Sequence, residues 1–158
     1  MTYDLERIEA EAAITRLIYA YCVGIDTGHL DDTARLFANG TWFLTEDSPI
    51  SGFRDVSTFL NDNVILYDGV PGTRHTVSNI VIDLSDDRVS AQAGSYVIVF
   101  QTVPGSPPHI MFQGAYADTF LRGSDGWHFH ERRIRTDGTG DMTLHLRGTE
   151  AQAVGTTA

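Results

Sequence analysis

Apolar residues recur at helical spacing in the first part of the chain and at alternate positions in the second. From Ile14 to Ile25 they follow the i, i+3, i+4 spacing of a helix with one buried face. Asp4 precedes this stretch as a candidate N-cap, and Gly28 follows it as a stop signal. The pattern predicts one long amphipathic helix near the N-terminus.

Two shorter helices and a strand are predicted next. Residues 31–38 (DDTARLFA) begin with two acidic side chains and stop before Asn39-Gly40, which is typical of a short helix. TWFLT, residues 41–45, has the composition of a strand. Residues 53–67 (FRDVSTFLNDNVILY) are predicted to form a third helix that Asp68-Gly69 closes.

Beyond residue 73 the apolar period changes from 3.6 to 2. Four segments rich in Val, Ile, Phe, Tyr and Thr, separated by turn clusters, predict antiparallel hairpins over residues 74–84, 89–103, 109–122 and 126–136. Three helices followed by a long meander predict an α+β fold with the helices on one face of a curved sheet. Such a sheet forms a cone whose wide end is a common place for a small-molecule site.

Composition narrows the class of protein. The 158 residues suit one domain, which we expect to span residues 1–147, with residues 148–158 as a mobile tail. A net charge of −10 argues against nucleic acid or a membrane surface as partner. The single cysteine, Cys22, excludes an intrachain disulfide and is expected to be buried and inert. The acidic N-terminus and the lack of a long apolar run favour a cytoplasmic protein.

Two residues far apart in the sequence form a candidate acid–base pair. His75 lies in GTRHTVSN, at the start of a predicted strand, and Asp26 lies in the last turn of the first helix. A carboxylate that orients an imidazole fixes its tautomer and raises its basicity. Asp26 could instead cap the following turn, and His75 could be a structural histidine. The pair becomes specific only if the fold brings the two side chains together.

Further candidates come from the first helix and from two strands. Tyr21 lies on the apolar face, where it could pack in the core or point its hydroxyl into a cavity. Trp42, on the first strand, is expected to be a wall residue. Strict alternation along the last strand places four residues on one face: His128, His130, Arg132 and Ile134. Arg132 is therefore either part of a solvated face or an inward cation that stabilises negative charge on a substrate.

Other chemistry has little support in the sequence. The remaining histidines do not have metal-ligand spacing with nearby carboxylates, so no metal is predicted. The chain has no G-x-G-x-x-G, no phosphate-binding loop and no G-x-S-x-G. We therefore expect neither a nucleotide cofactor nor a serine nucleophile.

Three stretches resemble a known family: residues 13–44, GTRHTVSNIVID and QGAYADTFLRGSDGWHFHERRI. They are similar to the SnoaL-like branch of the nuclear transport factor 2 fold, over roughly residues 5–136. That branch contains scytalone dehydratase, hexachlorocyclohexane dehydrochlorinase, bile-acid 7α-dehydratase and polyketide cyclases. The resemblance implies three N-terminal helices packed on a cone-shaped, strongly curved mixed sheet.

The resemblance also assigns roles to residues. Asp26 and His75 match the Asp–His pair of the lyases, and Tyr21 matches a tyrosine of the bile-acid dehydratase. Trp42 and Arg132 match the pocket tryptophan and arginine of the dehydrochlorinase. Scytalone dehydratase has a second pocket histidine on a later strand, where this chain has GSYVIVF without one.

The resulting hypothesis is a cofactor-independent lyase of dehydratase type, acting on a mostly apolar cyclic hydroxy-carbonyl substrate. Its catalytic residues would be His75, Asp26, Tyr21 and Arg132, and its substrate-binding residues Trp42, Phe112, Tyr116 and Tyr96. An isomerase or cyclase using the same pair is the alternative within enzymes. A non-catalytic ligand-binding protein and an oxygenase small subunit are alternatives of another class. The sheet is also expected to carry apolar side chains that helices leave uncovered, which predicts a homodimer or homotrimer.

Overall fold

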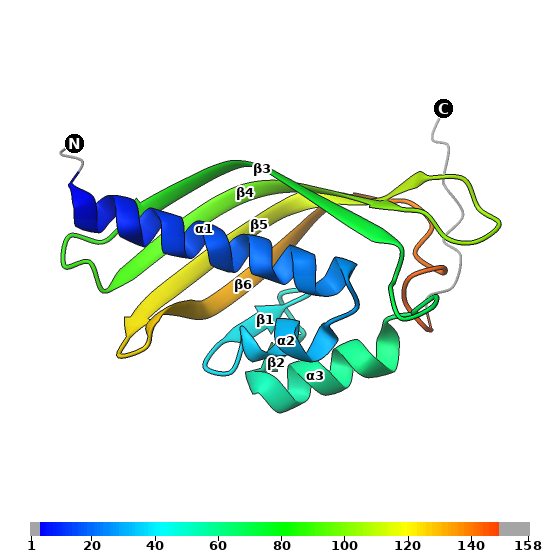
Figure 1. The fold of residues 1–158 in the computed structure, drawn as a ribbon, viewed down its shortest axis with the longest axis horizontal. Helices are drawn as coiled ribbons and strands as arrows, with labels where there is room; N and C mark the ends of the chain where they lie inside the picture. Colours follow the sequence, from blue (N-terminus) through cyan, green and yellow to red (C-terminus); the bar gives the residue numbers. More distant parts are fainter. Residues whose placement is uncertain (1–3, 149–158) are drawn as a thin grey trace.

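A six-stranded sheet curves around three helices in the computed structural model, which describes residues 4–148 (Figure 1). The elements follow in the order α1 (Leu5–Asp26), α2 (Leu30–Arg35), β1 (Thr41–Phe43), β2 (Pro49–Ser51), α3 (Gly52–Asn63), β3 (Thr73–Leu84), β4 (Ser90–Gln101), β5 (His109–Gly123) and β6 (Gly126–Thr139). The predicted tail lies outside the described residues, except for Gly148.

The strand order is β2-β1-β6-β5-β4-β3. Strands β3 to β6 form an antiparallel meander, whereas β1 pairs with β6 in parallel and with β2 in antiparallel orientation. The sheet is therefore mixed, and the predicted α+β fold, with three helices on a curved mixed sheet, is confirmed.

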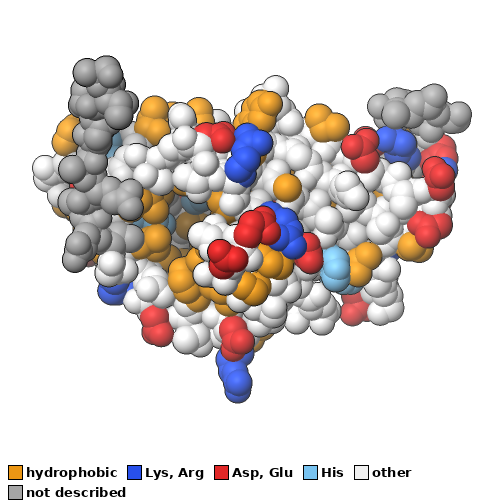
Figure 2. All heavy atoms as spheres, turned by 180° about the vertical axis from the view of Figure 1, so that it is seen from behind, with side chains coloured by type: hydrophobic (Ala, Val, Ile, Leu, Met, Phe, Trp, Pro, Cys, Tyr) orange, Lys and Arg blue, Asp and Glu red, His pale blue; other side chains and the backbone are white. Residues whose placement is uncertain are grey.

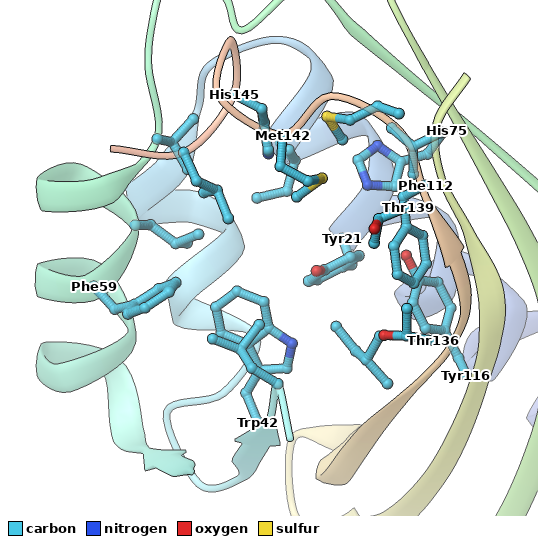
Figure 3. Close-up of a pocket in the computed structure, with 18 residues that line it drawn as sticks. Tyr21, Trp42, Phe59, His75, Phe112, Tyr116, Thr136, Thr139, Met142 and His145 are labelled. Atoms are coloured by element: carbon cyan, nitrogen blue, oxygen red, sulfur yellow. The ribbon is translucent and has the colours of Figure 1, made fainter. Parts of the chain in front are cut away.

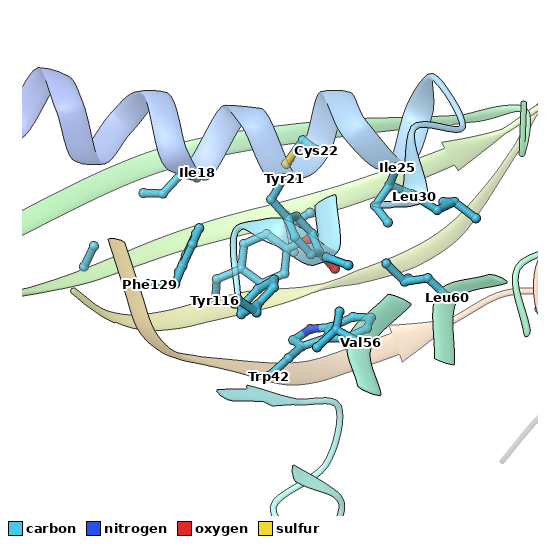
Figure 4. Packing of buried hydrophobic residues seen from close by; sticks show 14 of the residues in the cluster. Ile18, Tyr21, Cys22, Ile25, Leu30, Trp42, Val56, Leu60, Tyr116 and Phe129 are labelled. Atoms are coloured by element: carbon cyan, nitrogen blue, oxygen red, sulfur yellow. The ribbon is translucent and has the colours of Figure 1, made fainter. Parts of the chain in front are cut away.

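The first helix follows its sequence signals closely. The Asp4 carboxylate accepts a hydrogen bond from the Arg7 backbone N–H at 3.0 Å, as an N-cap should. The buried positions of α1 lie on one face: Ala10, Ile14, Ile18, Tyr21, Cys22, Gly24 and Ile25. Figure 4 shows Tyr21 and Ile25 pointing toward the core that Tyr116, Trp42 and Leu60 complete. Burial of this face fixes the helix against the sheet.

The third helix is shorter than predicted. It ends at Asn63, not Tyr67, because Val64 turns to an extended conformation. Val64 then bridges Leu146, and the Ile65 backbone N–H donates to the His145 carbonyl at 2.8 Å. Pairing with a distant segment overrides helical periodicity here. The short strand β2 was not predicted; it pairs with β1 over three residues.

Strict alternation along the last strand was wrong. The pairing of β5 with β6 shifts register where Phe120 faces Phe129 and Thr119 faces Glu131, so His130 is an extra residue on β6. A β-bulge of this kind reverses the side-chain phase. Phe129 and Arg132 are both buried as a result, and His130 is exposed. Further register shifts occur in the β3–β4 and β4–β5 pairs. They bend the strands and contribute to the curvature of the sheet.

None of the helices in residues 4–148 combines the length and apolar character that a membrane span requires.

Candidate functional site

A cavity of about 220 Å³ lies between the sheet and the helices. Its walls come from α1, β1, α3, the four long strands and the segment 141–147, and Figure 3 shows the residues around it. Within residues 4–148, no Asp, Glu, Lys or Arg side chain lines this cavity. Most of its surface is aliphatic or aromatic, which suits an uncharged organic ligand.

The fold brings Asp26 and His75 together at this cavity. Asp26 ends α1 and His75 lies near the start of β3, and His75 Nδ1 is 2.6 Å from Asp26 Oδ1. The His75 backbone N–H donates to Asp26 Oδ2 at 2.8 Å, and the Thr73 hydroxyl donates to Oδ1 at 2.8 Å. The carboxylate therefore has three hydrogen bonds and a fixed position. It does not cap the turn after α1.

The charge state of Asp26 follows from these contacts. Burial acts to raise the pKa of the Asp26 carboxyl, but the hydrogen bonds and charge of His75 and the Thr73 hydroxyl outweigh it, so the pKa lies below its ordinary value. Because the carboxylate is ionised, it accepts a hydrogen bond from His75 Nδ1, which therefore carries the proton. The His75 lone pair is then on Nε2, the nitrogen available to a ligand in the cavity.

Two tyrosines face the same space. Tyr21 and Tyr116 are 4% and 3% exposed, and their rings meet edge to face, with centroids 5.9 Å apart. Figure 3 shows the Tyr21 hydroxyl pointing into the cavity, and the Tyr21 and His75 rings meet edge to face with centroids 6.1 Å apart. Burial raises the pKa of both phenols above the ordinary value. Both are therefore neutral hydrogen-bond donors at physiological pH.

Arg132 does not have the predicted place in the site. Its guanidinium is completely buried, does not line the cavity, and makes a bidentate ion pair with Asp118 at 2.9 and 2.7 Å. It lies 4.3 Å from the Tyr21 ring centroid and 4.0 Å from that of Tyr116. The structure therefore places Arg132 behind the cavity wall and not at the cavity surface. From there its charge acts on the rings of the two cavity tyrosines.

The predicted wall residues divide into two groups. Trp42, Phe112 and Tyr116 line the cavity, and Trp42 Nε1 is a buried donor without a partner among the described residues. Tyr96 does not line it. Its side chain is 56% exposed on the outer face of β4, because the inward positions of that strand are Ser95, Val97 and Val99. The structure therefore does not bring Tyr96 to this cavity.

His145 is a pocket residue that sequence patterns did not reveal. It belongs to the segment 141–147, which has no helical or strand periodicity but closes one side of the cavity. Met142 and Leu146 of the same segment line the cavity as well. Only the folded chain brings this segment to the site. No cluster of three or more His, Cys, Asp or Glu side chains that could hold a metal ion occurs in residues 4–148.

A known domain family matches most of the chain. The family model of the SnoaL-like domain matches residues 6–133. The chain belongs to the SnoaL-like domain family. A comparison of this SnoaL-like domain with curated proteins gives no match.

Several solved structures share the fold of this SnoaL-like domain. A protein from Novosphingobium aromaticivorans with the provisional name scytalone dehydratase has a TM-score of 0.71 and 23% identity, covering 97% of this chain and 98% of the other. A type 2 hexachlorocyclohexane dehydrochlorinase has a TM-score of 0.71 and 17% identity over 97% and 99% of the two chains. An NTF2-like protein with a cystatin-like fold, also from N. aromaticivorans, has a TM-score of 0.68 and 20% identity over 89% and 91%. At these identities the likeness concerns the fold.

Proposed function

We propose that this SnoaL-like domain is a lyase that removes water from an uncharged cyclic β-hydroxy ketone. The observation that carries the proposal is the 2.6 Å contact between His75 Nδ1 and the Asp26 carboxylate at the wall of an apolar cavity. Proton abstraction next to a carbonyl requires a base that is held in one tautomer and faces a cavity shielded from water. Structural neighbours that bear the names of a dehydratase and a dehydrochlorinase are consistent with elimination.

The reaction as proposed balances without a cofactor. His75 Nε2 removes the proton from the carbon next to the carbonyl, and the C–H electron pair forms an enolate. The enolate electrons then form the C=C bond while the C–O bond to the β-hydroxyl breaks. The departing hydroxide takes the proton from the His75 imidazolium and leaves as water. His75 thereby returns to its neutral form, and the substrate has lost one H₂O.

Tyr21 is assigned to hydrogen bonding, not to proton transfer. Since burial raises the pKa of its phenol, giving up the proton would be unfavourable. A neutral O–H directed into the cavity can stabilise the enolate oxygen by a hydrogen bond that strengthens as charge develops. Arg132, behind the Tyr21 ring, opposes the effect of burial and makes the phenol a better donor.

The test is turnover of a panel of cyclic β-hydroxy ketones, followed by mass spectrometry. Wild type is expected to form a product lighter by one water. His75→Ala should lower the rate by about 10²–10⁴-fold and Tyr21→Phe by about tenfold or more. Asp26→Asn should also slow the reaction, because an amide no longer stabilises the imidazolium. His128→Ala, on β6 outside the cavity, is the matched control and should leave the rate unchanged.

Two outcomes would reject the elimination. If His75→Ala turned over the substrate within a few-fold of the wild-type rate, His75 would not be the base. A product of unchanged mass that takes up deuterium from D₂O would instead favour an isomerase or cyclase that uses the same enolate.

We also propose that the domain self-associates through the outer face of the sheet, defined by Val81, Tyr96, Ile98, Phe100 and Ile110. These side chains are 37–61% exposed and lie on the side away from the helices. Contiguous exposed apolar side chains on a sheet favour a protein contact. On the face shown in Figure 2, hydrophobic side chains gather in several places, and charged side chains of both signs are dispersed between them.

A further inference from the structure

The segment 141–147 is held against the cavity by hydrogen bonds to its backbone. The Leu144 carbonyl accepts from the Tyr67 hydroxyl at 2.8 Å and from Gln101 Nε2 at 3.1 Å. The Arg147 side chain donates to the carbonyls of Asp62 and Val64, next to the end of α3. The segment is therefore a fixed wall of the cavity, held by hydrogen bonds to its backbone.

The His145 ring has a fixed position without a partner for its buried nitrogen. Its backbone N–H donates to the Met142 carbonyl and its own carbonyl accepts from Ile65. The side chain lines the cavity and the residue is 8% exposed, but Nδ1 has no hydrogen-bond partner in the described chain. A buried polar atom left in this way costs about 1–3 kcal/mol. Such a cost is typical of groups whose partner is a ligand or a bound water.

The chemistry of this ring suits a neutral ligand. Burial, with a smaller contribution from the charge of His75, lowers the pKa of His145 to about 4. The imidazole is therefore uncharged at neutral pH, with one N–H donor and one acceptor nitrogen. Figure 3 shows His145 and His75 on either side of Met142, and both histidines line the same cavity.

We infer that His145 is a second polar contact for the substrate, and that the cavity takes an uncharged cyclic molecule with oxygen substituents at two ends. This inference rests on the proposed function: one oxygen function reacts at His75, and the other hydrogen-bonds to His145. The absence of charged side chains from the cavity wall within residues 4–148 excludes a carboxylate or phosphate as the second substituent. A hydroxyl or a carbonyl remains.

Binding of 1-tetralone and its 5-, 6- and 7-hydroxy derivatives, measured by isothermal titration calorimetry, tests this inference without turnover. These ketones have no β-hydroxyl to eliminate, so binding is independent of whether the lyase proposal holds. At least one hydroxy isomer should bind wild type about three- to tenfold more tightly than 1-tetralone, which is the gain in affinity expected from one hydrogen bond. The ring nitrogen resonances of His145 should move when that isomer binds to ¹⁵N-histidine-labelled protein.

Variants separate a hydrogen bond from simple packing. His145→Phe keeps an aromatic side chain and should remove the preference for the hydroxy isomer, with the affinity for 1-tetralone within about twofold of wild type. His145→Asn places an amide near the position of Nδ1 and should retain part of the preference. His109→Phe is the matched control, because His109 Nε2 is also buried without a partner but does not line the cavity.

Three results would overturn the inference. The first is a preference that survives in His145→Phe. The second is a wild type that binds every hydroxy isomer no better than 1-tetralone. The third is a wild type that shows no saturable binding of any of these ketones.

Discussion

Arg132 is surrounded by aromatic rings and has one carboxylate partner. Arg132 Nε and Nη2 donate hydrogen bonds to the Asp118 carboxylate, and Nη1 has no hydrogen-bond partner in the described chain. The ring centroids of Tyr21, Tyr116 and Phe129 lie 4.0–4.8 Å from the central carbon of the guanidinium. Burial acts to lower the pKa of Arg132, but the charge and hydrogen bonds of Asp118 hold it above its ordinary value. The guanidinium is thus a permanent cation behind the two cavity phenols.

Removing the charge of Asp118 should destabilise the whole domain. Asp118→Asn leaves a buried cation without its counter-charge, and we expect a loss of about 3–5 kcal/mol in the free energy of unfolding by urea. Glu46→Gln is the matched control: Glu46 pairs with Arg133 at the surface, so less than about 1 kcal/mol should be lost. A double change to apolar residues, Arg132→Met with Asp118→Leu, should recover much of the stability. A loss below about 1 kcal/mol for Asp118→Asn would contradict this account.

The segment 141–147 is an element whose stability should depend on pH. Its His145 has a pKa of about 4 in the folded protein, against 6.5 for an unperturbed histidine. Burial is the largest cause of this low pKa, the charge of His75 lowers it further, and the charge of Asp26 opposes both. Because the pKa is lower when folded, the unfolded chain binds the extra proton between pH 6.5 and about 4. Stability from this group is therefore lost as the pH falls through that range.

His145→Phe should remove that contribution. Between pH 7 and pH 4.5, wild type should lose up to about 3 kcal/mol more unfolding free energy than the variant. The measurement is urea unfolding of both proteins at the two pH values. Equal losses in wild type and His145→Phe would show that His145 titrates as an exposed histidine.

At the scale of the whole molecule, the proposed self-association places the contact on the outer face of the sheet. Ile98→Arg places a charge at the centre of this face and should shift the sedimentation profile of the domain toward the monomer at micromolar concentrations. Leu5→Arg is the matched control, since Leu5 is 70% exposed at the start of α1, away from that face. A wild type that sediments as a monomer up to about 100 µM would contradict the proposed self-association.

The sequence alone determined the elements whose signals are local. The cap at Asp4 and the spacing from Ile14 to Ile25 define α1, and turn clusters separate the four long strands. Their order determined the α+β class. The resemblance in GTRHTVSN and in the first helix points to Asp26 and His75, which lie at the ends of well-defined elements.

Tertiary structure decided what depends on distant partners. The bulge at His130 set which face Arg132 occupies, and burial beside Asp118 removed it from the cavity. The phase of β4 put Tyr96 outside. His145 joined the site because Val64 bridges Leu146 and the Ile65 backbone N–H donates to the His145 carbonyl, contacts that local periodicity does not predict. Local spacing cannot encode such contacts, since side-chain direction after a bulge or in an irregular segment is fixed only by what packs against it.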